Sequence, residues 1–206
     1  MKRLTEIGQR TQTDKATYHH FTEVYDDIFS LYRNPRILEI GIYTFGSIQM
    51  YLEYFENPYI VAMDIEDKDE YLSDRWKFVK GDQCSVDDLA KCVEEEKYDI
   101  IIDDGGHTMK QQQVTLGFLL DQVKPGGYYI LEDLHTSFRT DYIESDCQFT
   151  SYEMLVKIRD KQIPFSNYIP IEKQQEIIDL VDKIDIFAKY PDYMAESVTS
   201  IIKIKN

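Results

Sequence analysis

Five short apolar segments constrain the fold of this chain more than any other feature of its sequence. They are rich in isoleucine, valine and tyrosine, and they cover residues 36–42, 59–65, 76–82, 98–103 and 127–133. Each has the length of a buried strand, and the stretches between them have the features of helices. Strands that alternate with helices predict an α/β fold, with a parallel, doubly wound sheet and helices on both of its faces.

The stretches between the strands carry two kinds of helix signal. Residues 46–55 place four apolar side chains at positions i, i+3, i+4 and i+7, which form one face of a helix. Residues 85–96 begin with Ser85 and Asp88 in the spacing of a capping box, and residues 108–123 again stack apolar side chains on one face. We therefore predict a helix in each of these three stretches.

Two segments near the end of the sequence predict a departure from parallel pairing. Residues 183–190 and 197–206 read as strands, and only six residues join them. Such a connection is too short for a parallel crossover, so we expect an antiparallel hairpin at one edge of a mostly parallel, seven-stranded sheet.

Two further segments fall outside the alternation. Residues 11–33 predict one helix with an aromatic-rich body, capped by Thr13 or Asp14. Residues 134–182 are longer than one connection requires and contain the stretch IPFSNYIP between two helical parts. We interpret them as an insertion on the substrate side, with a lid, a partner surface and a plain surface excursion left open.

Length and charge exclude several classes of protein. A length of 206 residues predicts a single domain over 1–206. The 38 acidic and 23 basic side chains give a net charge of -15, which disfavours nucleic acid and anionic membranes as partners. We find no apolar run near the roughly 20 residues of a membrane span and no apolar signal-peptide core, and we interpret the three cysteines as reduced thiols. These features predict a cytoplasmic protein.

The loop after the first predicted strand excludes two common ligands. In an open parallel sheet, ligands bind beyond the carboxyl ends of the strands. Gly41 and Gly46 have the glycine spacing of a Walker loop, but the lysine of that motif is absent. Tyr43 stands where the dinucleotide-binding pattern needs its second glycine. ATP and NAD are therefore disfavoured.

The next two strand ends carry polar residues that suit a nucleoside. Asp64 ends the second strand, where an acid accepts hydrogen bonds from ribose hydroxyls. Asp82 and Gln83 follow the third strand and suit the edge of an adenine. Together with the glycine loop, they predict an adenosine ligand without phosphates, of which S-adenosylmethionine is the common one.

Four carboxylates end the fourth and fifth predicted strands. Asp103 and Asp104 end one strand, and Glu132 and Asp133 end the other. Like charges this close are costly unless a cation or protons compensate them, and oxygen ligands without cysteine suit Mg²⁺ or Mn²⁺. The alternative is that the first pair caps the helix near Thr108 while the second pair is solvated.

The combination of these motifs resembles a known family. The segments TDKATYHHF, LEIGI with its GS loop, MDI, GDQ, IIDDGGH and PGGYYILEDLHTSF are similar to those of metal-dependent class I S-adenosylmethionine methyltransferases acting on sugar hydroxyls. This group includes the macrolide and aminocoumarin deoxysugar O-methyltransferases. The pairing of DDGGH with LEDLHTS is its specific part. The resemblance covers most of the chain and implies a Rossmann-like fold in which residues 1–34 form a helical cap over the cofactor.

The resemblance implies a role for each matched residue. His107 is the expected general base, with Asp104 beside it, and Asp104, Glu132 and Asp133 are the expected metal ligands. The expected cofactor-binding residues are Lys15, Glu39, Gly41, Tyr43, Ser47, Asp64, Ile65, Asp82, Gln83 and Asp103. Lys15 and His20 are expected to close over that pocket.

Two positions near these motifs are less defined. Phe45 departs from the family pattern, because relatives usually have a glycine there. His135 directly follows the expected metal ligands, and the sequence leaves open whether it faces solvent or substrate.

The predicted function is transfer of a methyl group from S-adenosylmethionine to a sugar hydroxyl. The expected acceptor is a deoxysugar such as rhamnose, free or on a glycan or glycoside, whose vicinal hydroxyls a divalent metal would bind. Three alternatives stay open: methylation of a catechol or another small diol, a nucleotide-dependent oxidoreductase, and a non-catalytic adenosine-binding module. The sequence also leaves open the sugar, the hydroxyl, homo-oligomerisation, and whether the chain is one domain of a larger glycan-modifying protein.

Overall fold

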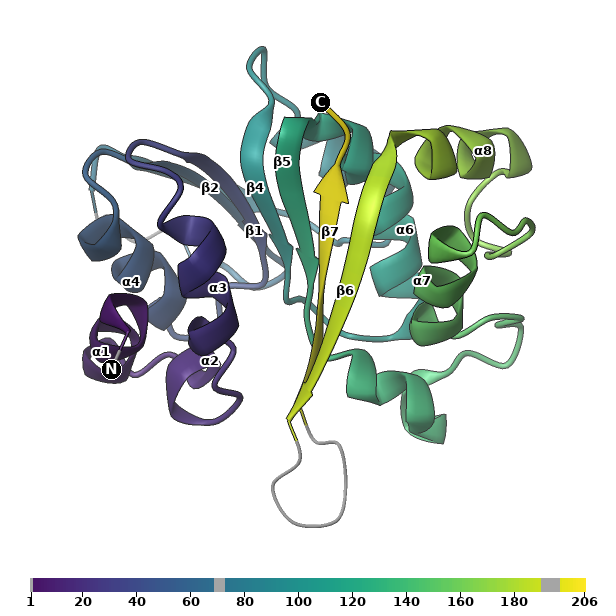
Figure 1. Cartoon of the computed structure of the whole chain (residues 1–206), viewed down its shortest axis with the longest axis horizontal. Helices are drawn as coiled ribbons and strands as arrows, with labels where there is room; N and C mark the ends of the chain where they lie inside the picture. The colour runs from purple at the N-terminus through teal and green to yellow at the C-terminus, as the bar shows by residue number, and fades with distance from the viewer. Residues whose placement is uncertain (1, 69–72, 190–196) are drawn as a thin grey trace.

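The computed structural model describes residues 2–68, 73–189 and 197–206, which form a seven-stranded sheet between two layers of helices (Figure 1). The strands are β1 (Arg36–Ile40), β2 (Tyr59–Asp64), β3 (Trp76–Lys80), β4 (Tyr98–Asp103), β5 (Val123–Leu131), β6 (Val181–Lys189) and β7 (Ser197–Ile204). Their order in the sheet is β3-β2-β1-β4-β5-β7-β6. The order reverses between β1 and β4, which marks the switch point where ligands bind in such sheets.

The pairing of the strands confirms the predicted fold. The first five strands are parallel, β7 pairs antiparallel with β5, and β6 pairs antiparallel with β7. The two last strands therefore form the predicted hairpin at one edge of the sheet. The residues that join them, together with the end of the predicted strand over 183–190, lie outside the described part of the chain.

Both faces of the sheet are buried, which explains why the strands are continuous apolar runs. Side chains alternate across each strand, so that Ile100 and Ile102 of β4 pack into one core while Ile101 packs into the other. One face is covered by α1 (Arg3–Arg10), α2 (Asp14–Thr17), α3 (Thr22–Phe29) and α4 (Gly46–Tyr54). The other face is covered by α5 (Val86–Leu89), α6 (Met109–Leu119), α7 (Ser151–Arg159) and α8 (Ile171–Leu180).

Four short 3-10 helices complete the described secondary structure. They are η1 (Ala90–Cys92), η2 (Leu120–Gln122), η3 (Leu134–Phe138) and η4 (Thr140–Tyr142). The segment predicted as an insertion, 134–182, contains η3, η4, α7 and α8, and the stretch IPFSNYIP joins the last two helices as expected. Within the described ranges, none of the helices has the length and apolar content to cross a bilayer.

The predicted single helix over 11–33 is wrong. The structure has two helices there, α2 and α3, and α1 precedes them within the segment 1–34 that was expected to be helical. The break falls at His20, whose φ of 57° is a left-handed conformation that a helix interior does not adopt. The aromatic residues of the segment belong to α3 and its start, where Phe21, Tyr25 and Phe29 recur every four residues and pack into the core.

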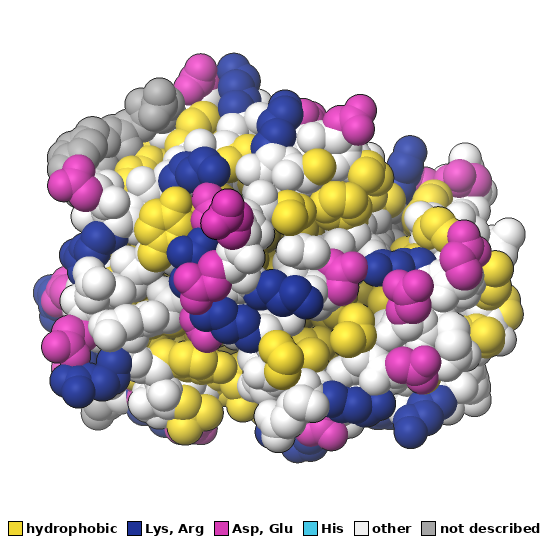
Figure 2. Space-filling model, turned by 90° about the horizontal axis from the view of Figure 1, so that it is seen from above, with side chains coloured by type: hydrophobic (Ala, Val, Ile, Leu, Met, Phe, Trp, Pro, Cys, Tyr) yellow, Lys and Arg dark blue, Asp and Glu magenta, His cyan; other side chains and the backbone are white. Residues whose placement is uncertain are grey.

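The predicted helix over 85–96 is too long. Ser85 caps α5 by accepting a hydrogen bond from the backbone N–H of Asp88, as its spacing predicted, but helical structure ends at Cys92. Glu94 lies beyond that end and forms ion pairs with Arg36 of β1 and Lys77 of β3. These ion pairs hold the segment against the amino ends of the strands, where acidic and basic side chains lie interspersed with apolar ones (Figure 2).

Replacement of one core aromatic of α3 tests how the N-terminal helices are held. The ring of Phe29 is fully buried against Tyr25, Tyr51 and Phe55. We expect Phe29→Ala to lower the free energy of unfolding by about 3–5 kcal/mol in urea denaturation, because a cavity replaces the ring. Leu31→Ala, at a side chain that is 68% exposed, should change it by about 0.5 kcal/mol or less. Equal losses would show that Phe29 does not anchor the layer.

Candidate active site

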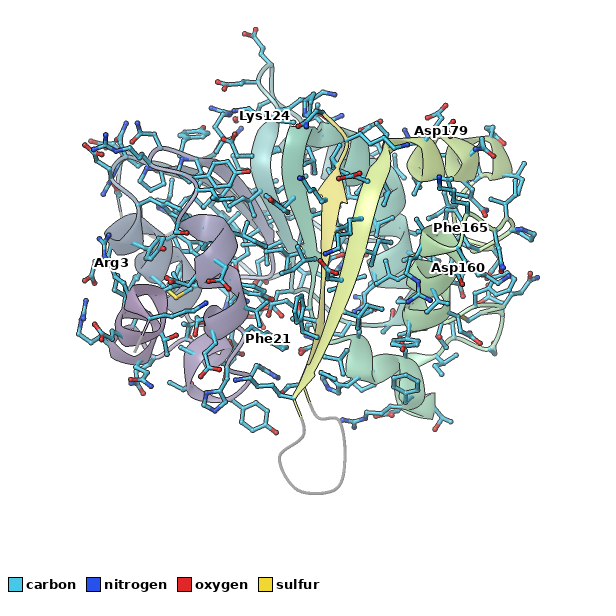
Figure 3. The ribbon with its side chains drawn as sticks, in the orientation of Figure 1. Arg3, Phe21, Lys124, Asp160, Phe165 and Asp179 are labelled. Atoms are coloured by element: carbon cyan, nitrogen blue, oxygen red, sulfur yellow. The ribbon has the colours of Figure 1, made fainter. Side chains whose placement is uncertain are left out.

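A cavity of about 430 Å³ opens at the carboxyl ends of the parallel strands, beside the switch point. In Figure 3 this end of the sheet is the one near Phe21, and Lys124 at the amino end of β5 marks the opposite end. The cavity is lined by Asp14, Gly41, Ile42, Tyr43, Asp64, Ile65, Glu66, Lys68, Gly81, Asp82, Gln83, Asp104, Gly105, Gly106, His107, Gln111 and Asp133. The loops after the first five strands thus supply most of its wall.

The loop after β1 is shaped by left-handed residues. Gly41 has a φ of 90°, and a Cβ there would overlap the backbone carbonyl of Asp104. Only glycine therefore allows the ends of β1 and β4 to approach this closely. Tyr43 and Phe45 have φ values of 48° and 65°. A glycine in place of Phe45, as the family resemblance implies, would adopt this conformation without strain, whereas here the Phe45 ring packs against Trp76.

Asp64 fixes the two loops that form one wall of the cavity. Its carboxylate accepts hydrogen bonds from the backbone N–H groups of Ile42 and Glu66, both at 2.9 Å. The large side chains of Tyr43 and Ile65 remain exposed beside it. Exposed apolar groups next to fixed polar groups are typical of a site for a flat, partly polar ring.

Gln83 joins the ends of β3 and β4 to helix α6. Its side-chain amide donates to Asp103 at 3.2 Å and to the hydroxyl of Thr115 at 3.1 Å, and its carbonyl accepts from the N–H of Gly106 at 2.7 Å. A Cβ on Gly105 would overlap this amide. The amide of Gln83 thus shapes the cavity wall as well as facing the cavity.

The residues predicted to bind a cofactor fall into two layers. Six of them line the large cavity, namely Gly41, Tyr43, Asp64, Ile65, Asp82 and Gln83. Lys15, Glu39, Ser47 and Asp103 are buried behind this wall. Lys15 and Ser47 also line a smaller cavity of about 30 Å³, which shares Gly41, Tyr43 and Asp104 with the large one. The Asp103 carboxylate, for example, accepts hydrogen bonds from Gln83 and from the hydroxyl of Tyr129 at 3.0 Å.

Lys15 lies at the centre of the buried layer. Its ammonium group is 3.4 Å from Oε1 of Glu39 and 3.3 Å from Oε2 of Glu132, and it also pairs with Oδ2 of Asp104. Burial alone would lower the pKa of Lys15, but the three carboxylates raise it well above its ordinary value. Lys15 is therefore a fixed positive charge, contributed by α2, that joins the ends of β1, β4 and β5.

Three side chains on the cavity wall could together hold a cation. Ligand atoms of Asp104, His107 and Asp133 lie within 4.8 Å of one another. Nε2 of His107 is 3.3 Å from Oδ2 of Asp133 and 4.0 Å from Oδ1 of Asp104. The alternative, in which the paired aspartates cap α6, is not observed, because Thr108 forms a capping box with Gln111.

Two buried oxygens beside this cluster support a cation site. Oε1 of Glu132 and Oδ1 of Asp133 accept no hydrogen bond from any residue that the structure describes. Burial raises the pKa of Asp133 to about 8, with the Asp104 charge adding to the effect, and burial also raises that of Glu132. Carboxylate oxygens of this kind are the ligands that Mg²⁺ and Mn²⁺ prefer, so the residues fit such an ion.

His107 is placed to exchange a proton. It precedes α6 with a φ of 62°, a left-handed conformation that turns its ring toward the two aspartates. Burial lowers the pKa of His107 below its ordinary value, although Asp104 opposes the shift. The imidazole is therefore neutral near pH 7 and can accept a proton.

His19 was not identified from the sequence. Its Nδ1 is hydrogen bonded to the hydroxyl of Ser197 at 2.8 Å and lies 3.8 Å from Oδ1 of Asp133. The neighbouring His20, which the resemblance places over the pocket, is exposed at the turn and is not among the described residues that line the cavity. Which of the two adjacent histidines approaches Asp133 depends on the left-handed turn at His20, which the motif TDKATYHHF does not reveal.

Curated proteins similar to this chain are O-methyltransferases. Demethylmacrocin O-methyltransferase from Streptomyces fradiae is 36% identical over 146 residues, which cover 66% of this chain and 37% of that protein. Mycinamicin VI 2''-O-methyltransferase from Micromonospora griseorubida is 31% identical over 172 residues, which cover 76% of this chain and 43% of that protein. The chain thus spans less than half the length of these relatives. No family profile matches the chain.

Solved structures show the same relationship. The MycE methyltransferase of the mycinamycin pathway, solved with Mg, SAH and mycinamycin VI, has a TM-score of 0.79 at 26% identity. The match covers 98% of this chain and 55% of MycE. A putative O-methyltransferase from Klebsiella pneumoniae has a TM-score of 0.55 at 13% identity and shares the fold alone.

Removal of the buried lysine tests the charge balance of the site. Lys15→Met would leave the buried Glu39 and Glu132 and the partly exposed Asp104 without their shared cation, so we expect it to lower the free energy of unfolding by about 3–5 kcal/mol. Lys97→Met, at an exposed position, should have little effect. Urea denaturation of both variants would check this, and equal stability of the two would refute the central role of Lys15.

The raised carboxyl pKa values also predict an unusual pH dependence. Burial raises the pKa of Glu39 and Asp103 to about 7 and that of Asp133 to about 8, whereas these groups titrate near pH 4 in an unfolded chain. Between these values the folded protein binds more protons than the unfolded one, so its stability falls as the pH rises. We expect urea denaturation in EDTA to show lower stability at pH 8 than at pH 5.5. A constant or rising stability would contradict this expectation.

Proposed function

Because this chain is by sequence and fold a homologue of the sugar O-methyltransferases of macrolide and tetracenomycin pathways, we propose that it transfers a methyl group from S-adenosylmethionine to a sugar hydroxyl. One observation carries the proposal. Asp104, His107 and Asp133, the residues that could hold a cation, all lie on the wall of the cavity at the switch point. A cofactor in that cavity would therefore adjoin the groups that act on the acceptor.

The cavity wall supports the assignment of the cofactor. S-adenosylmethionine, when bound, supplies a methyl group on a positively charged sulfur. Asp64 and Asp82 offer carboxylates on one side of the cavity, and Tyr43 and Ile65 offer exposed apolar surface for an adenine. Gly41 keeps the backbone beside the methionine part free of a side chain. Lys15 and Ser47, which line the smaller adjoining cavity, would bind the cofactor directly, and Glu39 and Asp103 would act on it through this wall.

The carboxylate cluster supports a divalent cation, Mg²⁺ or Mn²⁺. Asp104, Asp133 and Glu132 would hold it, and a cation bound there stabilises negative charge on a hydroxyl oxygen and can orient two vicinal hydroxyls. His107 would accept the hydroxyl proton at Nε2, because its lowered pKa keeps it neutral. The resulting imidazolium would lie 3.3 Å from Asp133, which stabilises its charge.

The finer assignments extend the same proposal. A relative from Streptomyces olivaceus is a 2'-O-methyltransferase of a rhamnosyl tetracenomycin, so a deoxysugar such as rhamnose is the proposed acceptor. Residues 1–34 would cap the cofactor, residues 134–182 would form the acceptor side, and 1–206 would act as one domain. We also propose that the protein acts in the cytoplasm and that its acceptor sugar is part of a glycan. We further propose that the chain is one domain of a larger protein.

A direct assay separates this function from its alternatives. Calorimetric titration with S-adenosylmethionine and with NAD identifies the cofactor, and transfer of labelled methyl to 4-nitrophenyl α-L-rhamnoside or to catechol identifies the acceptor class. We expect binding of S-adenosylmethionine alone, and transfer to the rhamnoside that EDTA abolishes. Transfer to catechol alone would replace the sugar assignment, and binding of NAD alone would refute the methyltransferase assignment.

Isosteric replacement of the metal ligands tests their role. We expect Asp104→Asn and Asp133→Asn to lower kcat at least about 100-fold, because the amide no longer binds a hard cation. Asparagine tolerates the left-handed conformation of Asp133, whose φ is 54°, so the fold should persist. Affinity for S-adenosylmethionine should stay within a few fold, and the exposed control Asp74→Asn, which precedes β3 at the opposite end of the sheet, should keep its activity. An equal loss of cofactor affinity would contradict the assignment.

A further inference from the structure

Two histidines from distant parts of the chain flank Asp133 on the side away from His107. Nδ1 of His19 lies 3.8 Å and Nδ1 of His135 lies 3.7 Å from Oδ1 of Asp133, whereas Oδ2 faces His107. The two ring centroids are 6.4 Å apart. Hydrogen bonding to Ser197 and stacking on Phe21 fix the ring of His19. The side chains of His19 and His135 are 12% and 16% exposed, so each keeps a small accessible part.

An exposed aromatic ring adjoins each histidine. The Tyr18 side chain is 59% exposed, and its ring meets that of His19 edge to face at 4.8 Å. Phe138 is 65% exposed and lies three residues after His135 in the 3-10 helix η3, where residues three apart project on the same side. Tyr18, His19, His135 and Phe138 are named the histidine strip below. In this strip the two imidazoles can form hydrogen bonds, and the two exposed aromatic rings lie beside them. Such a surface is typical of a site for a ligand ring that has both hydroxyls and apolar faces.

The histidine strip and the large cavity meet at Asp133. His107 and Asp133 line the cavity, but none of the four strip residues is found among the described residues of its wall. Displacement at a methyl group proceeds in line, so the acceptor must approach from the side opposite the sulfur. The strip adjoins the other oxygen of Asp133 and does not line the cofactor cavity, so an acceptor seated on it would lie beside the expected metal ligands without occupying the cofactor site.

We propose that the histidine strip is the acceptor subsite and that it selects a neutral, hydroxyl-bearing ring, an inference that rests on the proposed function. His19 and His135 hydrogen bond to hydroxyls next to the one that reacts, while Tyr18 and Phe138 pack against the apolar faces of the ring. Anionic sugars are disfavoured, because Asp14, which is not one of the expected metal ligands, lies on the adjoining cavity wall. Of the nearby positive charges, Lys15 is buried among its own carboxylates, and Arg139, which follows Phe138, pairs with Asp141.

Matched variants separate this role from a structural one. His19→Asn removes the imidazole, and His20→Asn is its control, because His20 is an exposed neighbour whose left-handed conformation asparagine tolerates. Phe138→Ala removes an exposed ring, and Leu31→Ala removes an equally exposed apolar side chain that precedes β1, at the opposite end of the sheet. His135→Ala completes the set. The probes are 4-nitrophenyl α-L-rhamnoside and the anionic 4-nitrophenyl β-D-glucuronide.

The measurements are kcat and KM with S-adenosylmethionine and Mg²⁺, and probe binding by saturation-transfer NMR with S-adenosylhomocysteine and Mg²⁺. We expect His19→Asn, His135→Ala and Phe138→Ala each to raise KM for the rhamnoside by about 3- to 10-fold, the size of one lost neutral contact. Their kcat and their calorimetric affinities for Mg²⁺ and cofactor should stay near the wild-type values. The two controls should match the wild type, and the glucuronide should bind more weakly than the rhamnoside.

Three results would overturn the proposal. An unchanged KM in the strip variants would remove the strip from the acceptor site, and a parallel loss of Mg²⁺ affinity would show that the histidines only support Asp133. Tighter binding of the glucuronide would refute the selection of neutral rings. Failure of the wild type to bind S-adenosylmethionine would instead refute the proposed function, so the two failures are distinguishable.

Discussion

The pairing of Lys15 with three carboxylates is the interaction on which the rest of the site depends. Glu39, Asp104 and Glu132 end three neighbouring parallel strands, so the topology of the sheet brings their charges together whatever their function. A buried cluster of like charges would oppose the folding of the sheet at its centre. One lysine from a short N-terminal helix offsets that repulsion. The sheet and the N-terminal segment are therefore held together by the same charges that the site needs.

The oxygens of these carboxylates have two different roles. Lys15 takes one oxygen of Asp104 and one of Glu132, which leaves Oδ1 of Asp104 toward His107 and Oε1 of Glu132 without a described hydrogen-bond donor. The buried layer thus orients carboxylates whose remaining oxygens are available to an ion. Orientation of metal ligands by charged groups behind them is a general feature of metal sites. Lys15, which also lines the smaller cavity beside Gly41 and Tyr43, thus positions the carboxylates of the cluster.

The sequence predicted the sheet well because buried parallel strands leave a plain signal. Continuous apolar runs such as IIID of β4 identify both the strands and the polar residues that follow them, and these residues converge wherever parallel strands end together. The N-terminal helices were predicted poorly, since the turn at His20 depends on a backbone conformation that has no local sequence signal. The position of His19 and the burial of Lys15 depend on contacts with residues far along the chain, which periodicity cannot reveal.

The bond between His19 and Ser197 spans 178 residues of sequence, and Tyr25 is bonded to Thr199 over 174 residues. Both bonds attach the N-terminal helical layer to β7, the strand inserted between β5 and the edge strand β6. During synthesis on a ribosome, His19 leaves the exit tunnel long before β7 exists. The first five strands and their carboxylates can thus assemble before the N-terminal helices that cover them form their hydrogen bonds to β7. The ligand-binding end of this molecule is consequently completed late, by a strand that contributes no carboxylate to it.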